Sequence, residues 1–453
     1  MTIGAGCDAS TPLERGAGTR DEAGATEPGD GAGTISAPQG SPNGIDHVLS
    51  TGQSNAISFA GREVLSREQA FGNVMFDRGV MTAAGCDADG CTRFEEPAAI
   101  APLVEGDVYF DYPVETMSSG LANQIARTAQ ARGASPSILV SVHGRSGNTY
   151  ECLRKGGCSF LEGRGYVKAF DEAMKQIAAG RQLARAAGRP YRVTAITAVH
   201  GESDHYVDSF PLDGTDGAAR AIATYADALV EWQRDYEESI REATGQTWTI
   251  PLLVSQMSNW NDRPNSAIPI RQLEAHDRAP GRVVLVGPTY FLPFASDCIH
   301  FTSDGQRRLG EYFAKAYARV VLEGGRWEPV RPAAVSFAGD VVTVRFVVPK
   351  PPLVLDTTSV TDPGDDGFEV VDSSGVRLGV ASVAVTAPDT VSIRLATPGA
   401  TPARLRYAFT ARPNTCPGPA LGPRGNLRDS DDTPSNYGYR LYNWAVHFDV
   451  AIR

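Results

Sequence analysis

"HVLSTGQSN", residues 47–55, joins a run of strand-forming residues to a group of small and polar ones. The run from 47 to 51 contains apolar and β-branched side chains, which is typical of a buried strand. It ends at Gly52, and the tripeptide after that glycine carries a serine, Ser54. In a parallel sheet, this order places a hydroxyl at the edge where ligands bind. A strand that only turns a corner has the same pattern, so the surrounding sequence has to distinguish the two interpretations.

Four further apolar runs and five amphipathic segments follow this first strand. The runs are 137–142 (SILVSV), 192–199 (RVTAITAV), 251–257 (PLLVSQM) and 282–287 (RVVLVG). Helical periodicity covers 118–133, 166–188, 218–245, 271–278 and 303–325. The last segment opens with Ser303 and Gln306 in capping-box spacing. Because the strands are continuously apolar and do not alternate, the pattern predicts an α/β fold with a doubly wound parallel sheet, the three-layer flavodoxin-like arrangement.

From about residue 328, the period of the apolar residues changes. Short alternating segments such as VVTVRFVV, SVAVTA and VSIRLA are separated by Gly, Pro and Asp, which predicts a C-terminal β-sandwich. We therefore expect three regions, 1–44, 45–325 and 328–453. The first is rich in Gly, Ala, Pro, Ser and acidic residues, and it is predicted to be a disordered tether. The second is the expected catalytic domain, and the third is an accessory domain.

Composition and charge exclude some classes of partner. The chain has 453 residues, of which 42% are hydrophobic and 21% are charged, as in globular proteins. Its net charge of −11 argues against binding to nucleic acid or anionic lipid, because neutralising phosphates requires a basic surface. No apolar run reaches the roughly 18 residues that a transmembrane helix needs.

The cysteines indicate an exported protein. There are seven, namely Cys7, Cys86, Cys91, Cys152, Cys158, Cys298 and Cys416. The pairs 86/91 and 152/158 lie in short loops that contain glycine, and this spacing suits local disulfides. A zinc site is the alternative, but neither pair has CxxC spacing and no histidine cluster accompanies them. Cys7 follows small residues, as the lipid-bearing cysteine of a bacterial lipoprotein does, so a lipid anchor at this position is an open alternative.

Cys298 and Cys416 remain when these residues are set aside, and we expect them to form a third disulfide. This bond would close a loop of more than a hundred residues, for which the chain-entropy model gives roughly 4 to 5 kcal/mol. It would also tie the loop around Cys298 to the β-sandwich. The alternative is that Cys298 is a buried free thiol that packs as a small apolar residue.

Asp297 and His300, in "SDCIHFT", supply what a serine nucleophile needs. A serine hydroxyl attacks only when a base removes its proton, and a carboxylate has to hold that base in the correct tautomer. These two residues follow the last predicted strand of the sheet, whereas Ser54 follows the first. The crevice of a doubly wound sheet brings such loops together. The pattern therefore predicts a triad of Ser54, His300 and Asp297 that needs no metal and no other cofactor.

Two other loops end strands at the same predicted edge. "VSVHGRSGNTYECL" offers Gly144 and Gly147, and "ITAVHGESDHYVD" begins its polar part with His200. Acyl transfer requires N–H donors directed at the developing oxyanion, and these loops can supply them. Glycines that follow strands also turn the chain without any such role. Ser146 and Ser203 are alternative nucleophiles, although Ser146 lacks the GxSxG arrangement of an α/β-hydrolase.

In combination, GQSNA, HGESD and the late DxxH resemble the blocks of the SGNH hydrolases, in the branch of the sialate O-acetylesterases and acetylxylan esterases. The resemblance covers residues 45 to about 322. It implies that Ser54 is the nucleophile, His300 the base and Asp297 the carboxylate that orients it. The implied oxyanion donors are Ser54 and Gly147, with Gly144 as the alternative, and His200 where that branch has glutamine. The residues expected to support the site are Gln53, Asn55, Glu202 and Asp204.

We therefore expect a serine esterase that removes O-acetyl or similar short acyl groups from a carbohydrate. A lipase or thioesterase of the same superfamily is one alternative, although the loops around Ser54 are polar and rich in glycine. A non-catalytic carbohydrate-binding protein is another, because four aromatic residues could stack on sugars or equally belong to the core: Tyr437, Tyr439, Tyr442 and Trp444. The chain is expected to be a monomer that acts outside the cell, at a bacterial surface or in the periplasm.

Overall fold

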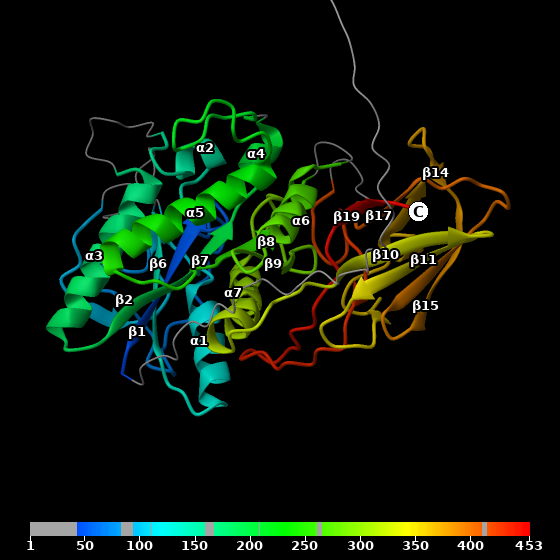
Figure 1. The fold of residues 1–453 in the computed structure, drawn as a ribbon. Coiled ribbons are helices and arrows are strands. Elements are labelled where there is room, and N and C mark those ends of the chain that lie inside the picture. Colours follow the sequence, from blue (N-terminus) through cyan, green and yellow to red (C-terminus); the bar gives the residue numbers. More distant parts are fainter. Residues whose placement is uncertain are drawn as a thin grey trace, which may run out of the picture. The chain divides into compact units, whose positions relative to one another are not determined.

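A seven-stranded sheet carries the first part of the fold (Figure 1). The structure, a computed structural model, describes residues 43–82, 94–109, 111–158, 167–207, 209–260, 265–409 and 415–453. The strands in spatial order are β3 (Ile100–Pro102), β2 (Val74–Phe76), β6 (Ser137–Val142), β1 (Ile45–Gly52), β7 (Tyr191–Val199), β8 (Leu252–Gln256) and β9 (Val283–Pro288). Neighbouring strands are parallel except for β2 and β3. The predicted doubly wound sheet is therefore confirmed, with β1 between β6 and β7.

Helices cover both faces of this sheet. They are α1 (Ser118–Gln130), α2 (Tyr150–Leu153), α3 (Ala169–Ala186), α4 (Glu202–Tyr206), α5 (Tyr225–Thr244), α6 (Ile268–Arg278) and α7 (Ser303–Tyr317), which continues as a π-helical turn, η1 (Ala318–Leu322). Consecutive residues of β1 point to opposite faces. Val48 packs in the core that includes Leu121 of α1 and Phe313 of α7, whereas Leu49 packs in the core that includes Ile177 of α3 and Trp232 of α5. Figure 1 shows α3 and α5 side by side.

The last third of the chain forms the predicted β-sandwich. One antiparallel sheet has the order β10 (Arg331–Ala338), β11 (Val341–Val347), β16 (Thr390–Leu395) and β15 (Val380–Ala387). The other has the order β14 (Arg377–Leu378), β13 (Phe368–Val371), β17 (Arg404–Tyr407) and β19 (Phe448–Ala451). Phe346 of β11 meets Phe448 of β19 across the space between the sheets, with ring centroids 6.0 Å apart. Shorter elements are β4 (Val108–Tyr109) with β5 (Tyr112–Pro113), β12 (Val354–Leu355) with β18 (Leu427–Arg428), and the 3-10 turn η2 (Asp365–Gly367).

The sandwich and the α/β part share one apolar core. Val284 and Phe313 of the α/β part belong to the same buried cluster as Val344 and Ile393 of the sandwich. The side-chain amide of Gln256, at the end of β8, donates to the backbone carbonyl of His447 at 3.0 Å and accepts from its N–H at 2.8 Å. The described residues belong to one compact unit. The boundaries 45–325 and 328–453 remain predictions.

The aromatic residues near the C-terminus pack against the α/β part. Trp444 is buried and stacks on Phe291 with ring centroids 5.6 Å apart. The guanidinium groups of Arg307 and Arg308, on α7, lie over the rings of Tyr437 and Tyr439. These contacts favour the interpretation that the aromatic segment is part of the fold and not an exposed sugar-binding strip.

Two of the three predicted disulfides are present, Cys152–Cys158 and Cys298–Cys416. The predictions for the tether, for Cys7 and for Cys86–Cys91 fall outside the described residues, apart from positions 43 and 44. None of the described helices is both long and apolar enough to span a bilayer. The described part of the chain also has no group of three or more His, Cys, Asp or Glu side chains that could hold a metal ion.

Candidate active site

The end of β1 approaches the end of β7 so closely that only glycine fits there. Gly52 has φ +133°, and a Cβ atom on it would lie 2.1 Å from the carbonyl oxygen of Val199. The N–H of Gln53 donates to the same carbonyl at 3.2 Å, and the chain then turns. Ser54 therefore lies beyond the carboxyl end of β1, beside β7, where a doubly wound sheet reverses its winding. Its side chain is nearly buried, with 5% of the residue exposed.

Ser54, His300 and Asp297 form a continuous hydrogen-bonded chain. The Oγ of Ser54 lies 2.6 Å from Nε2 of His300, and Nδ1 of His300 lies 2.8 Å from Oδ2 of Asp297. A carboxylate can only accept, so Nδ1 carries the proton and Nε2 presents its lone pair to the serine hydroxyl. This is the arrangement in which an imidazole can remove the serine proton.

Asp297 is held in its ionised form by the loop around it. Burial alone would raise the pKa of Asp297, but hydrogen bonds from the backbone N–H groups of His300 and Ile299 and from the His300 ring bring that pKa below its usual value. Both backbone bonds reach Oδ1 at 3.0 Å, which leaves Oδ2 for the ring. The loop therefore orients the carboxylate before any substrate binds.

The loop from 294 to 301 is closed on itself and covalently tied to the sandwich. The N–H of Ala295 donates to the carbonyl of His300 at 2.7 Å, and the N–H of Cys298 donates to the carbonyl of Ala295 at 3.0 Å. Cys298 has a left-handed backbone conformation, with φ +64°, and its sulfur is bonded to Cys416. The ring of Phe59, which follows Ser54 in the chain, lies against the ring of His300 with centroids 4.6 Å apart.

Asn55 and Glu202 join the Ser54 loop to the His300 loop. The amide of Asn55 donates to Glu202 at 2.7 Å and to the carbonyl of Ile299 at 3.2 Å, and its oxygen accepts from the N–H of Phe301 at 3.1 Å. The amide of Asn259 makes a parallel pair of bonds, to the same Glu202 oxygen at 2.9 Å and to the Ile299 carbonyl at 2.7 Å. Asn259, after β8, belongs to no motif of the sequence, so sequence analysis missed it.

Gln53 and Gln306 add two further links to the Ser54 loop. The side chain of Gln53 accepts from the N–H of Ser203, in α4, at 2.9 Å. The side chain of Gln306, on α7, donates to the carbonyl of Asn55 at 2.8 Å. Gln306 is therefore not part of a capping box with Ser303, because Thr302 caps α7 by accepting from the N–H of Gly305.

His200 is buried, and both of its ring nitrogens are bonded within the fold. Its Nε2 lies 3.1 Å from the carbonyl oxygen of Asn148, and its Nδ1 lies 2.8 Å from the hydroxyl of Tyr225. A carbonyl only accepts, so Nε2 carries the proton and the Tyr225 hydroxyl donates to Nδ1. Donation by His200 to an oxyanion would require Nε2–H to leave Asn148, and this role remains a prediction.

Asp204 connects α4 to the segment that carries the Cys152–Cys158 disulfide. One of its carboxylate oxygens accepts from the N–H of Tyr150 at 2.8 Å and lies 3.5 Å from Nε2 of His200. Burial raises the pKa of Asp204 more than the neighbouring His200 and the Tyr150 N–H lower it. Asp204 therefore contacts Tyr150 and His200, and it holds α4 against the segment that begins at Tyr150.

The two candidate glycines differ in their surroundings. Gly144 packs against the Ser54 loop, since a Cβ on it would lie 2.9 Å from the Gly52 carbonyl oxygen and 3.2 Å from the Cβ of Ala56. Gly147 is exposed and left-handed, with φ +70°, and a Cβ on it would meet nothing within 4 Å. Of the three candidate serines, only Ser54 is hydrogen-bonded to a histidine within the described part of the chain.

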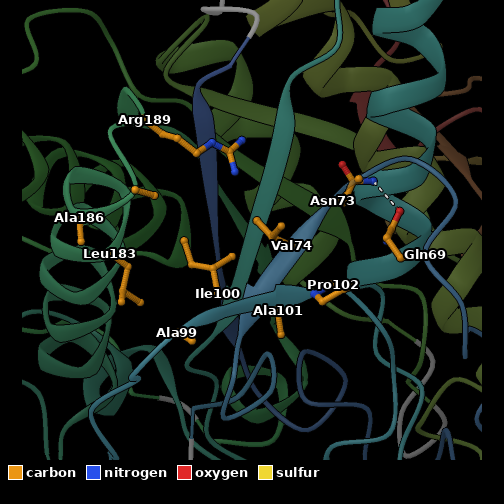
Figure 2. Close-up of a pocket in the computed structure, with 12 residues that line it drawn as sticks. Gln69, Asn73, Val74, Ala99, Ile100, Ala101, Pro102, Leu183, Ala186 and Arg189 are labelled. Carbon is orange, nitrogen blue, oxygen red and sulfur yellow. Dashed lines mark hydrogen bonds between the residues drawn. The ribbon is translucent and has the colours of Figure 1, made fainter.

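A separate hollow lies at the opposite end of the sheet and is not part of this site. It has a volume of about 640 Å³ and lies beside the edge strand β3, between Asn73 and the end of α3 (Figure 2). Its polar side chains are engaged in the fold. Gln69 donates to the carbonyl of Leu103 at 2.9 Å, and Arg189 donates to the hydroxyl of Ser137 at 2.7 Å. The Ser54 loop contributes nothing to its lining.

Comparison with known proteins supports the fold. No protein-family model and no curated protein matches the chain. The solved structure of XAC1771, described as a novel carbohydrate acetylesterase from Xanthomonas citri, matches with a TM-score of 0.54 at 15% identity, over 89% of this chain and 80% of that one. This chain shares its fold. The predicted fold class, a doubly wound α/β sheet followed by C-terminal antiparallel sheets, is therefore confirmed, and at this identity the likeness shows the fold alone.

Two other solved structures match over a smaller share of this chain. Est24, a carbohydrate acetylesterase from Sinorhizobium meliloti, is 11% identical over 60% of this chain and 98% of that one, with a TM-score of 0.31. An aryl esterase from M. smegmatis is 12% identical over 60% of this chain and 97% of that one, with a TM-score of 0.30. At these TM-scores we draw no conclusion about this chain from the two structures.

Proposed function

We propose that this chain is a serine esterase that removes O-acetyl or similarly short acyl groups from a carbohydrate, with Ser54 as nucleophile, His300 as base and Asp297 as the carboxylate that orients it. The observation that carries the proposal is the hydrogen bond of 2.6 Å between Ser54 Oγ and His300 Nε2, with Asp297 on the other side of the ring. Three groups with these roles act as a unit in acyl transfer.

In the proposed reaction, Ser54 Oγ attacks the ester carbonyl carbon while its proton moves to Nε2 of His300. The bond between the carbonyl carbon and the sugar oxygen then breaks, and the leaving sugar hydroxyl takes that proton. Water, deprotonated by His300, attacks the acyl-serine, and the acid is released as Ser54 regains its proton. Asp297 stays ionised throughout and stabilises the imidazolium that forms twice in the cycle.

The developing oxyanion needs N–H donors, and the N–H of Ser54 is the first that we propose. It has no hydrogen-bond partner among the described residues, as a donor reserved for the transition state would have none. The second donor is proposed in the segment 144–148. Sequence analysis favoured Gly147, but the packing of Gly144 against the Ser54 loop favours Gly144. His200 is proposed to hold this segment through Asn148.

The proposed location is outside the cytoplasm. Two disulfides within the described residues support it, because such bonds persist in oxidising compartments. An acetylated carbohydrate as substrate is supported by the polar, glycine-containing loops around Ser54 and agrees with the activity named for XAC1771. These loops suit a short acyl group better than a long one, because a long acyl chain would need an enclosed apolar pocket.

Hydrolysis of p-nitrophenyl acetate by the Ser54→Ala and Ser146→Ala variants tests the proposal. We expect the first to lose roughly ten-thousandfold or more in kcat, because nucleophile and base act together, and the second to keep wild-type activity. Longer p-nitrophenyl esters should be poorer substrates than the acetate. Retained activity in Ser54→Ala, or a preference for long acyl chains, would contradict the proposal.

A further inference from the structure

Several exposed large hydrophobic side chains lie on segments that are bonded to the loops of the candidate site. The described part of the chain has five of them, Val108, Tyr206, Val207, Val376 and Leu421, with exposed fractions between 43% and 59%. All except Val376 lie on segments that contact the loops carrying Ser54 or His300. We call these four residues the apolar rim. Single exposed hydrophobic residues are ordinary, but several around one site indicate a binding surface.

Tyr206 and Val207 extend outward from the support of the Ser54 loop. Tyr206 follows Glu202 by four residues in α4, so the two side chains lie on the same face of the helix. Glu202 is buried and accepts from Asn55, the neighbour of Ser54, whereas Tyr206 is 43% exposed. On this face of α4, Glu202 therefore lies at the candidate site and Tyr206 lies one turn further on, where it is exposed to solvent.

Leu421 belongs to a loop of the sandwich that is bonded to the His300 loop. Cys416 forms a disulfide with Cys298 of the His300 loop. Gly418 lies close to Leu292 and Phe294, at the start of the His300 loop. The loop is tight, because a Cβ on Gly422 would lie 3.0 Å from the carbonyl oxygen of Cys416. Leu421, in the same turn, thus belongs to a loop that is tied to the His300 loop.

Val108 lies on a third segment that contacts the Ser54 loop. It lies in β4, which pairs with β5, and the hydroxyl of Tyr112 in β5 donates to the carbonyl of Phe59 at 2.9 Å. The ring of Phe59 is the one that packs on His300. Three segments that are distant in the sequence therefore carry exposed apolar side chains and are each bonded to a loop of the candidate site.

We infer that the apolar rim binds the sugar rings on either side of the acetylated one, so that the substrate is an oligomeric glycan and not a single acetylated sugar. This inference rests on the proposed esterase function. Sugar rings present apolar C–H faces between polar edges, and a tyrosine offers a flat apolar ring with a polar tip. Side chains on three separate segments suit a ligand that is longer than one ring. They remain half exposed, whereas a fatty acyl chain would need an enclosed pocket.

The test compares acetate release from acetylated xylo-oligosaccharides of about five residues with release from peracetylated xylose and p-nitrophenyl acetate. Tyr206→Ala and Leu421→Ser should raise KM for the oligosaccharides, about tenfold for the tyrosine, and leave kcat unchanged. Both variants should keep wild-type kinetics on the two small esters. Tyr206→Phe should restore the oligosaccharide KM, since it keeps the ring. Val376→Ser, which changes an even more exposed side chain on the sandwich, is the matched control and should change nothing.

Several results would overturn the inference. One is an unchanged KM for the oligosaccharides in both rim variants. Another is a loss of activity that is equal on the small esters and on the oligosaccharides. A rise in KM confined to long-chain p-nitrophenyl esters would make the rim an acyl site. Sedimentation that shows a wild-type dimer dissociated by Tyr206→Ala would make it a contact between two copies of the chain. If the wild-type protein hydrolyses none of the esters, the proposed function fails, and the inference fails with it.

Discussion

His200 is the residue at which this chain departs from the glutamine of the family that its motifs resemble. Its Nε2–H donates to the Asn148 carbonyl, and its Nδ1 accepts from Tyr225. His200→Ala removes both bonds and frees the segment that contains the proposed second oxyanion donor. We expect kcat for p-nitrophenyl acetate to fall on the order of a hundredfold. His200→Gln keeps a donor of similar reach and should retain most of the activity.

Thermal unfolding of the two His200 variants separates this effect from a loss of stability. If both variants fold at room temperature and show equal, mild losses of kcat, His200 serves only in packing.

The residues of the candidate site were predictable to different degrees. Ser54, Asp297 and His300 lie in short motifs at strand ends, so the sequence alone could place them at one edge of the sheet. Asn259 has no motif, and its bonds to Glu202 and to the Ile299 carbonyl depend on how the loop after β8 folds. The two partners of His200 were equally hidden, because an isolated histidine in a sequence does not reveal what its nitrogens face.

Among the elements, the five long strands of the sheet were predictable because buried parallel strands are continuous apolar runs. β2 and β3 were missed, since three residues each are too few to show a period. The cap of α7 was misplaced by one residue for a similar reason. Thr302 and Ser303 are both good caps in the sequence, and only the backbone geometry selects Thr302.

The disulfide Cys298–Cys416, between the His300 loop and the sandwich, should contribute more to stability than the disulfide Cys152–Cys158. Cys298 and Cys416 are 118 residues apart, whereas Cys152 and Cys158 are 6 apart. The chain-entropy model gives about 5 kcal/mol for the long loop and about 2 kcal/mol for the short one. We therefore expect the Cys298→Ser/Cys416→Ser double variant to lose more stability in urea unfolding than Cys152→Ser/Cys158→Ser.

The long-loop variant should also lose turnover at temperatures where it is still folded, because Asp297 and His300 flank Cys298. Equal losses of stability in the two double variants, with unchanged turnover in both, would contradict the supporting role of the sandwich.

Where the sandwich joins the α/β part, His447 makes the stability depend on pH. Its Nδ1–H donates to the Ala408 carbonyl, and its Nε2 faces the Ser258 hydroxyl. Burial lowers the pKa of His447 to about 3. In the unfolded chain a histidine titrates near 6.5, so the unfolded state takes up the proton first as the pH falls. The stability that His447 contributes is present above pH 6.5 and is lost progressively towards pH 3.

His447→Gln isolates this effect from the other buried groups. Between about pH 6.5 and 4, the free energy of unfolding of the wild-type protein should fall more steeply than that of the variant, by up to about 1.4 kcal/mol per pH unit. Urea unfolding at several pH values measures the difference. Parallel curves for the two proteins would mean that His447 is not buried in its neutral form.

The central claim is that Ser54 is the nucleophile of an esterase, and covalent labelling tests it most directly. A fluorophosphonate reacts with a serine only when an adjacent base activates it, so peptide mapping of the labelled wild-type protein identifies the nucleophile. We predict one phosphonyl group on the peptide that contains Ser54, and no label in the His300→Ala variant. A label on Ser146 or Ser203, or an unlabelled wild-type protein, would contradict the claim.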